Sequence, residues 1–132
     1  MRKEQEMVRE FMIKAGQECP VYPTLEPSER IKELRIRLID EELDELTEAM
    51  EDCDRIGVAD AIGDLLVVVL GTAVAYGFDI EPIFNEIHRS NMSKFIDGYK
   101  RADGKWIKGP SYSPACLQPI IEAQCAKAQS VP

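Results

Sequence analysis

Apolar residues recur at spacings of three and four along most of the chain, a pattern typical of amphipathic helices rather than strands. A first helix is predicted over residues 3–15, because its apolar residues share one side: Met7, Val8, Phe11 and Met12. Gly16 is expected to end this helix. Three prolines within residues 19–27 exclude a helix there and predict an extended loop.

A long helix is predicted from Pro27 or Ser28 to about Asp54. Its buried stripe is expected to consist of four residues at heptad-like spacing: Ile39, Leu43, Leu46 and Met50. On a helical wheel of about 100° per residue, Glu42 and Glu45 fall within roughly 60° of each other, beside that stripe. The two carboxylates therefore share a side of the helix with apolar or small neighbours.

A second helix is predicted over residues 58–76, separated from the first by Gly57 and ended by Gly77. Two helices joined by so short a turn are expected to pack antiparallel. Asp60 and Asp64 are four residues apart and share one face of this helix. The antiparallel arrangement brings that face within reach of the glutamates on the first long helix.

Further elements follow the two long helices. Asp79 is expected to cap a helix with Pro82 in its first turn, which ends around residues 91–94. Glycine-containing turns over residues 95–108 predict irregular structure or a small hairpin. Ser113 and Pro114 predict the start of a last helix that ends at about Lys127. The sequence thus predicts an all-α fold, a four- to five-helix bundle.

The length of 132 residues predicts one domain over residues 1–132, with a core at 27–94 and a basic arm and last helix at 95–128. A formal charge of −8 argues against a nucleic-acid polymer or a membrane surface as partner. The four cysteines are scattered, without a CxxC pair. The polar N-terminus lacks a signal segment, and we expect a soluble cytoplasmic protein with free thiols.

Charge is distributed unevenly along the chain. Eleven acidic residues lie between Asp40 and Asp64, against one base in that stretch. Six bases against two acids follow between Arg89 and Lys108. Carboxylates on two facing helices suit Mg²⁺, a hard cation that prefers oxygen ligands and commonly bridges to phosphate. From spacing alone, however, an acidic run on a helix is more often a solvated face, so both interpretations stay open at this point.

Two acidic motifs resemble those of a known family. The stretches Glu41-Glu42-Leu43-Asp44-Glu45 and Asp60-Ala-Ile-Gly-Asp64 resemble the EExxE and ExxD signatures of the all-α nucleoside triphosphate pyrophosphohydrolases. These include the MazG-like and phosphoribosyl-ATP pyrophosphohydrolase-like enzymes. The later stretch Glu86–Lys94 resembles the Asn/Lys segment of these members. The resemblance implies a helical bundle that uses Mg²⁺, or Mn²⁺, to hydrolyse the α–β phosphoanhydride of a nucleotide.

The resemblance also implies roles for particular residues. Glu42, Glu45 and Asp64 match metal ligands, and Glu41 matches the acid that orients the attacking water. Asn91 and Lys94 match phosphate-binding residues. One position departs from the pattern: the ExxD motif places an acid at position 61, where this chain has alanine. Asp60 lies one residue earlier and is expected to substitute for that acid as a metal ligand.

Several other residues could bind or react with a ligand, but the sequence favours simpler roles for most of them. Lys108 belongs to the basic arm, which either attracts phosphate or is a solvated loop. His88, the single histidine, is expected to have a packing or surface role. Trp106, Tyr99 and Tyr112 favour packing over base stacking. The cysteines lack the histidine partners that a cysteine nucleophile needs. The sequence contains no Glu-x-x-His pair, which argues against di-iron chemistry.

Three functional hypotheses follow. The first is Mg²⁺-dependent hydrolysis of a (deoxy)nucleoside triphosphate to monophosphate and pyrophosphate, a housecleaning reaction. The second is hydrolysis of phosphoribosyl-ATP by the same chemistry. The third is a helical nucleotide-binding or protein-interaction module that has lost turnover through the change at Ala61. A homodimer or a dimer of dimers is expected, because the apolar run Leu65–Leu70 lacks enough partners within one chain.

Overall fold

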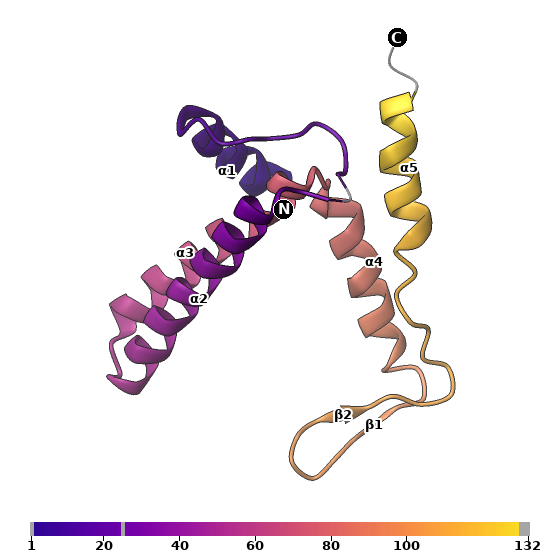
Figure 1. Ribbon diagram of the computed structural model, residues 1–132. Helices are drawn as coiled ribbons and strands as arrows, with labels where there is room; N and C mark the ends of the chain where they lie inside the picture. Colours follow the sequence, from indigo (N-terminus) through magenta and orange to yellow (C-terminus); the bar gives the residue numbers. More distant parts are fainter. Residues whose placement is uncertain (1, 25, 130–132) are drawn as a thin grey trace. The chain divides into compact units, whose positions relative to one another are not determined.

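The computed structural model describes residues 2–24 and 26–129, which form five α-helices and a two-stranded hairpin (Figure 1). The predicted all-α class is confirmed. The chain divides into two compact units, the first ending at Ile80 and the second beginning at Glu81. The prediction of one domain over the whole chain stays a prediction.

The core of the first unit lies between helix α1 (Arg2–Lys14) and helix α3 (Arg55–Tyr76). Its buried members are Val8, Met12, Leu70, Val74 and Ala75. The Gln5 side chain ties this core to the end of α3, because it donates to the Phe78 carbonyl at 2.6 Å and accepts from the Ile80 N–H at 3.0 Å. A buried amide with both hydrogen-bonding groups satisfied stabilises the packing instead of opposing it.

Helix α2 (Glu29–Glu51) and helix α3 form a hairpin joined by residues 52–54. Ser28 caps α2, as the sequence predicts. The predicted start of α3 is wrong by three residues, because the Asp54 side chain accepts the Gly57 N–H at 3.0 Å and the helix begins at Arg55. Gly57 therefore lies in the first turn of α3 and does not separate the helices.

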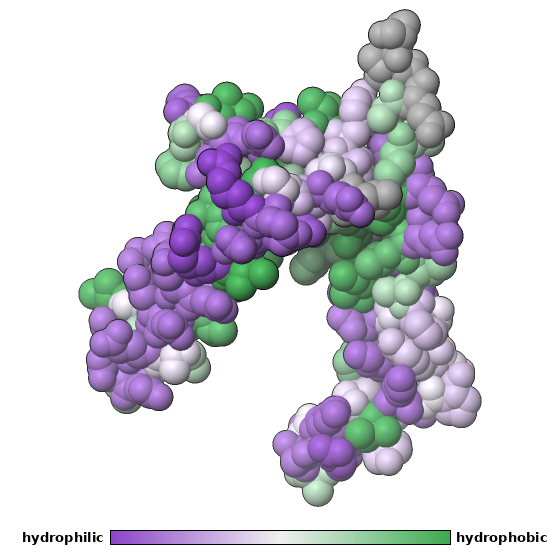
Figure 2. Space-filling view, in the orientation of Figure 1, coloured by the Kyte–Doolittle hydropathy of each residue, from purple (hydrophilic) through white to green (hydrophobic). Residues whose placement is uncertain are grey.

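The stripe predicted to be buried on α2 is partly exposed. Leu43 is 47% exposed and Met50 is 61% exposed, so that prediction is wrong for the single chain. The side of α2 that contacts α3 instead carries Arg35, which is 5% exposed. Helix α3 exposes apolar residues as well, and they interrupt the polar surface of the hairpin (Figure 2): Ile62, Leu66, Val67 and Val69.

Gly77 ends α3, as predicted, with a φ of +76°. The loop between α1 and α2 passes over this turn, since the Thr24 N–H donates to the Tyr76 carbonyl at 2.9 Å. A Cβ on Gly77 would collide with the Tyr22 carbonyl. Both the left-handed conformation and the close approach of the loop therefore require glycine here.

Helix α3 is the one helix in the described part of the chain that is long and apolar enough to cross a membrane, with 22 residues and a mean hydropathy of 2.0. Core helices of soluble proteins have the same length and composition. Here α3 packs against both α1 and α2. It also carries Asp60 and Asp64, and carboxylates are costly inside a bilayer. These features favour a core helix.

The second unit contains most of helix α4 (Ile80–Ser93), strands β1 (Tyr99–Lys100) and β2 (Trp106–Ile107), and helix α5 (Gln118–Gln129). The two strands pair antiparallel, which confirms the predicted hairpin. Trp106 packs on Phe95 with ring centroids 4.8 Å apart and donates to the Lys94 carbonyl at 2.8 Å. Both contacts fix Trp106 within the arm, in agreement with its predicted packing role.

The predicted start of the last helix at Ser113 and Pro114 is wrong, because α5 begins at Gln118. Arg89 of α4 donates to the carbonyls of these two residues at 3.5 and 3.2 Å. Ser93 Oγ accepts the Ser113 N–H at 2.9 Å. These bonds to α4 use the backbone groups that a helix would need, and they keep the segment extended.

Candidate active site

The register of the α2–α3 hairpin brings the predicted acids together. Arg35 lies against Gly71, where a Cβ would come within 2.8 Å of its Nη2. Two heptads further along α2, Ala49 lies against Gly57, where a Cβ would come within 3.2 Å of the alanine Cβ. Residue 42 is midway between the two contacts on α2, and residue 64 is midway between them on α3. The register therefore places Glu42 opposite Asp64.

Glu42 is the most perturbed of these carboxylates. Its Oε2 is shielded from solvent and has no hydrogen-bond partner among the residues described. Burial raises the pKa of Glu42, and the charges of Glu45, Asp64, Glu41 and Asp60 raise it further, in that order. All four predicted neighbours are thus close enough to act on it. A cation placed here would relieve both the lost solvation and the repulsion.

Position 61 differs from the ExxD pattern, and its surroundings show what the change does. Ala61 is 3% exposed, so a small apolar side chain is buried where the pattern has an acid. Asp60 is exposed and lines an open cavity of about 400 Å³ together with Glu45 and Glu48. Asp60 and Glu45 therefore line the same cavity. Asp60 as a direct metal ligand stays a prediction.

The acids fit a hard cation by their chemistry. Across residues 2–24 and 26–129, no three His, Cys, Asp or Glu side chains are gathered tightly enough to hold a metal ion as they stand. Mg²⁺ does not require this, because it commonly binds through one or two carboxylates and keeps several waters. The unpartnered Oε2 of Glu42 is an available oxygen ligand. The residues that would hold the ion are Glu42, Glu45, Asp60 and Asp64.

The predicted phosphate-binding residues gather in the second unit. Lys94 Nζ donates to the Asn91 side-chain oxygen at 3.0 Å. Lys94 and Lys108 both lie over the ring of Tyr112, with Nζ-to-centroid distances of 5.8 and 4.5 Å. Two ammonium groups held beside one aromatic ring and an amide are suited to contacting phosphate oxygens. Their role in binding stays a prediction.

Arg35 was not among the predicted residues, and it is buried on α2 two turns before Glu42. Its position is seven residues before Glu42, so both face α3 on the same side of α2. That heptad spacing is the one signal that could have found it. The other candidates stay peripheral: His88 is exposed on α4, and all four cysteines are free.

Residues 8–91, more than half of the chain, match the sequence model of a family described as phosphoribosyl-ATP pyrophosphohydrolase. The match includes the acids of α2 and α3 and ends at Asn91, so Lys94 and Lys108 lie outside it. No curated protein matches the chain.

Proposed function

The chain belongs to the phosphoribosyl-ATP pyrophosphohydrolase family, in the MazG-like superfamily, and we propose that it hydrolyses the α–β phosphoanhydride of a (deoxy)nucleoside triphosphate in a Mg²⁺-dependent reaction. Water adds to the α-phosphorus, and the products are a nucleoside monophosphate and pyrophosphate. The family supports a pyrophosphohydrolase. The choice of substrate and of metal is our proposal.

The observation that carries the proposal is the unpartnered, shielded Oε2 of Glu42 among four other carboxylates. A carboxylate oxygen that is shielded from solvent and has no partner is costly unless a cation neutralises it. On a helix face that is simply exposed to solvent, no carboxylate would have its pKa raised by burial, as that of Glu42 is. The arrangement thus supports a cation site over a solvated face.

The proposed roles follow from the positions of the side chains. Glu42, Glu45, Asp60 and Asp64 would hold the ion, which when bound neutralises phosphate oxygens and promotes ionisation of the attacking water. The Glu41 carboxylate is exposed at the same face and would accept the proton of that water. Within the second unit, Asn91, Lys94 and Lys108 would contact phosphate oxygens of the substrate.

Phosphoribosyl-ATP is the second candidate substrate, favoured by the description of the matched family. It contains the same α–β phosphoanhydride, so the same acids and the same attack on the α-phosphorus would serve. Membership of a family does not by itself transfer a substrate. The two candidates are therefore separated by assay.

We also propose that the protein is a homodimer, or a dimer of dimers, that covers the exposed apolar residues of the hairpin. Leu66 is 48% exposed and Val69 is 46% exposed on α3, and Leu43 is 47% exposed on α2, so each helix leaves apolar surface uncovered within one chain. Sedimentation or light scattering tests this. A protein that stays monomeric at high concentration would contradict it, and Leu66→Glu is expected to dissociate the dimer.

The activity is tested by incubating the protein with Mg²⁺ and a panel of nucleotides that includes phosphoribosyl-ATP. Pyrophosphate and the monophosphate are measured together, because a diphosphate product would indicate cleavage at the β–γ bond. Calorimetry with the same nucleotides identifies the alternative of a binding module, which would bind nucleotide without product. Absence of product from every nucleotide with a folded protein would refute the proposed reaction.

Glu45→Gln provides the site-directed test, because it keeps the shape of the side chain and removes the charge. We expect a loss of about 10²–10³-fold in kcat, the scale seen when one electrostatic contact of an active site is removed. The matched control is Glu51→Gln at the end of α2, the same chemical change outside the acids that act on Glu42. Equal activity of both variants would place the site elsewhere.

A further inference from the structure

A cavity of about 460 Å³ lies within the first unit, apart from the acidic cluster. Its walls come from the end of α1, the first turns of α2 and Ala75 of α3, and none of the proposed metal ligands lines it. Three arginines line the cavity, Arg30, Arg35 and Arg37, against two carboxylates. The charge of its walls is therefore positive, in a chain whose net charge is −8.

Arg35 is the buried member of this set. It is 5% exposed, and its Nε is shielded from solvent without an acceptor in the described ranges. Its one hydrogen bond is long, 3.4 Å from Nη2 to the Val68 carbonyl. That carbonyl already accepts the Thr72 hydroxyl at 2.9 Å. Burial lowers the pKa of Arg35, with the neighbouring Cys19 opposing the shift.

A buried guanidinium normally has a carboxylate or several carbonyls as partners. Arg35 has neither in the part of the chain described, because no carboxylate lies within ion-pair distance and one shared carbonyl is its sole acceptor. The desolvation of this charge is thus poorly compensated. An anion in the adjoining cavity would give the guanidinium an acceptor besides the shared Val68 carbonyl.

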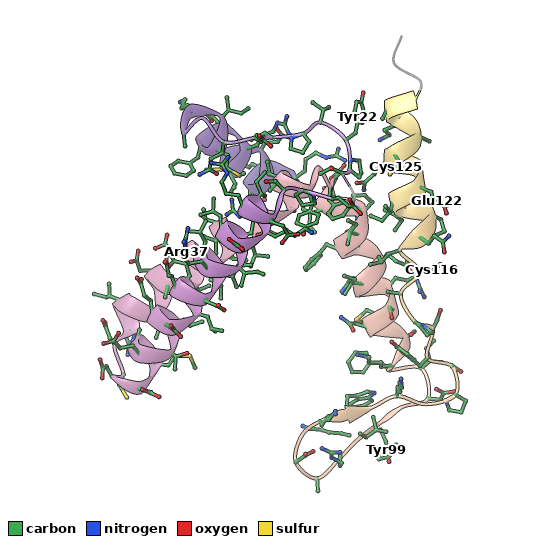
Figure 3. All side chains as sticks on the ribbon, viewed as in Figure 1. Tyr22, Arg37, Tyr99, Cys116, Glu122 and Cys125 are labelled. Carbon is green, nitrogen blue, oxygen red and sulfur yellow. The ribbon has the colours of Figure 1, made fainter. Side chains whose placement is uncertain are left out.

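We propose that this cavity binds a phosphate group, with Arg35 as the main contact and Arg30 and Arg37 at the rim. The planar guanidinium presents donors that match two phosphate oxygens. Arg37 projects from α2 in Figure 3 and is exposed, so it can reach a bound group from the solvent side. This site is separate from the proposed hydrolytic centre and does not depend on hydrolysis.

The phosphate group could come from two sources, and thermal unfolding with different ligands separates them. Inorganic phosphate and pyrophosphate represent a free anion, whereas ribose 5-phosphate represents a phosphomonoester end of a larger molecule. All are tested without Mg²⁺, against sodium acetate at matched ionic strength. Binding to the folded state alone is expected to raise Tm by about 5 °C at ten times the Kd.

Arg35→Met carries the mutational test, because it keeps an unbranched side chain against Gly71 and removes the charge. We expect it to abolish the phosphate-dependent rise in Tm without lowering the Tm in phosphate-free buffer, since an uncompensated charge is lost. Lys32→Met removes an equal charge from the same helix outside the cavity and is expected to keep the rise. Arg35→Lys, which keeps the charge, is expected to weaken binding about tenfold, and it replaces Arg35→Met if that variant does not fold.

Three outcomes would overturn the proposal. They are no rise with any phosphate compound, an equal rise with acetate, or a rise that persists in Arg35→Met. Glu45→Gln separates this test from the proposed hydrolysis, because that variant alters the acidic cluster and is expected to keep the full rise. Failure of the hydrolytic activity would therefore leave the result for the cavity unaffected.

Discussion

Replacing Gly71 with alanine tests how α2 packs on α3, because two opposed effects meet at that position. In the interior of a helix, alanine is more favourable than glycine by about 1 kcal/mol. At Gly71, however, the new Cβ would lie 2.8 Å from Arg35 Nη2 and 3.3 Å from its Cζ. The first distance is shorter than a normal contact, so the buried guanidinium would have to move.

The size of the effect follows from a comparison with Gly63 on the same helix. A Cβ at Gly63 meets no atom within 4 Å, so Gly63→Ala is expected to raise the free energy of unfolding by about 1 kcal/mol. Gly71→Ala has the same gain, offset by about 1 kcal/mol for displacing the end of the Arg35 side chain. The two variants are therefore expected to differ by about 1 kcal/mol, with Gly71→Ala the less stable.

Urea unfolding followed by circular dichroism measures both variants at one protein concentration, since association would make stability depend on concentration. Equal stabilisation by the two alanines would refute the packing of Arg35 on Gly71. The double variant with Arg35→Ala provides a further check, because removing the guanidinium should let Gly71→Ala recover its gain.

Three further changes have defined outcomes. The Arg89 side chain and the Cys116 N–H hold the pKa of Glu86 at about 2, below its usual 4.5. Its ionised form therefore stabilises the fold above pH 4.5, and the Tm difference between wild type and Glu86→Gln should vanish as pH falls to 2. Gly77→Ala should cost about 2–4 kcal/mol in urea unfolding, from left-handed strain and the clash with the Tyr22 carbonyl. Glu42→Gln should raise the Tm of the metal-free protein, because it removes repulsion, and should abolish the Mg²⁺-dependent rise; an unchanged Mg²⁺ effect would contradict the site.

The helices could be predicted where their ends depend on local residues. Ser28 and Gly77 mark helix ends through bonds and conformations within a few residues, so the sequence is sufficient. The start of α5 could not be predicted in this way. Arg89 holds Ser113 and Pro114 in an extended conformation from 24 and 25 residues away in the chain, and no local pattern reports that contact.

The proximity of the acids on α2 and α3 could also be predicted, because a short turn forces these two helices to pack antiparallel. The burial of Arg35 could not be predicted, because it depends on the absence of a side chain at Gly71 across the hairpin. The burial of the apolar stripe on α2 could not be predicted either, because Leu43 and Met50 are exposed within one chain although their spacing is that of a buried face.

The register of the hairpin keeps two opposite charges apart. A slip of one heptad between α2 and α3 would bring Arg35 opposite Asp64 and pair a guanidinium with a carboxylate. The short turn at residues 52–54 and the fit of Ala49 on Gly57 oppose that slip. Arg35 and the acidic pair of Glu42 and Asp64 therefore stay unpaired, about 10 Å apart along α2. This is local frustration retained in a folded protein, and it leaves both charges available to ligands of opposite sign.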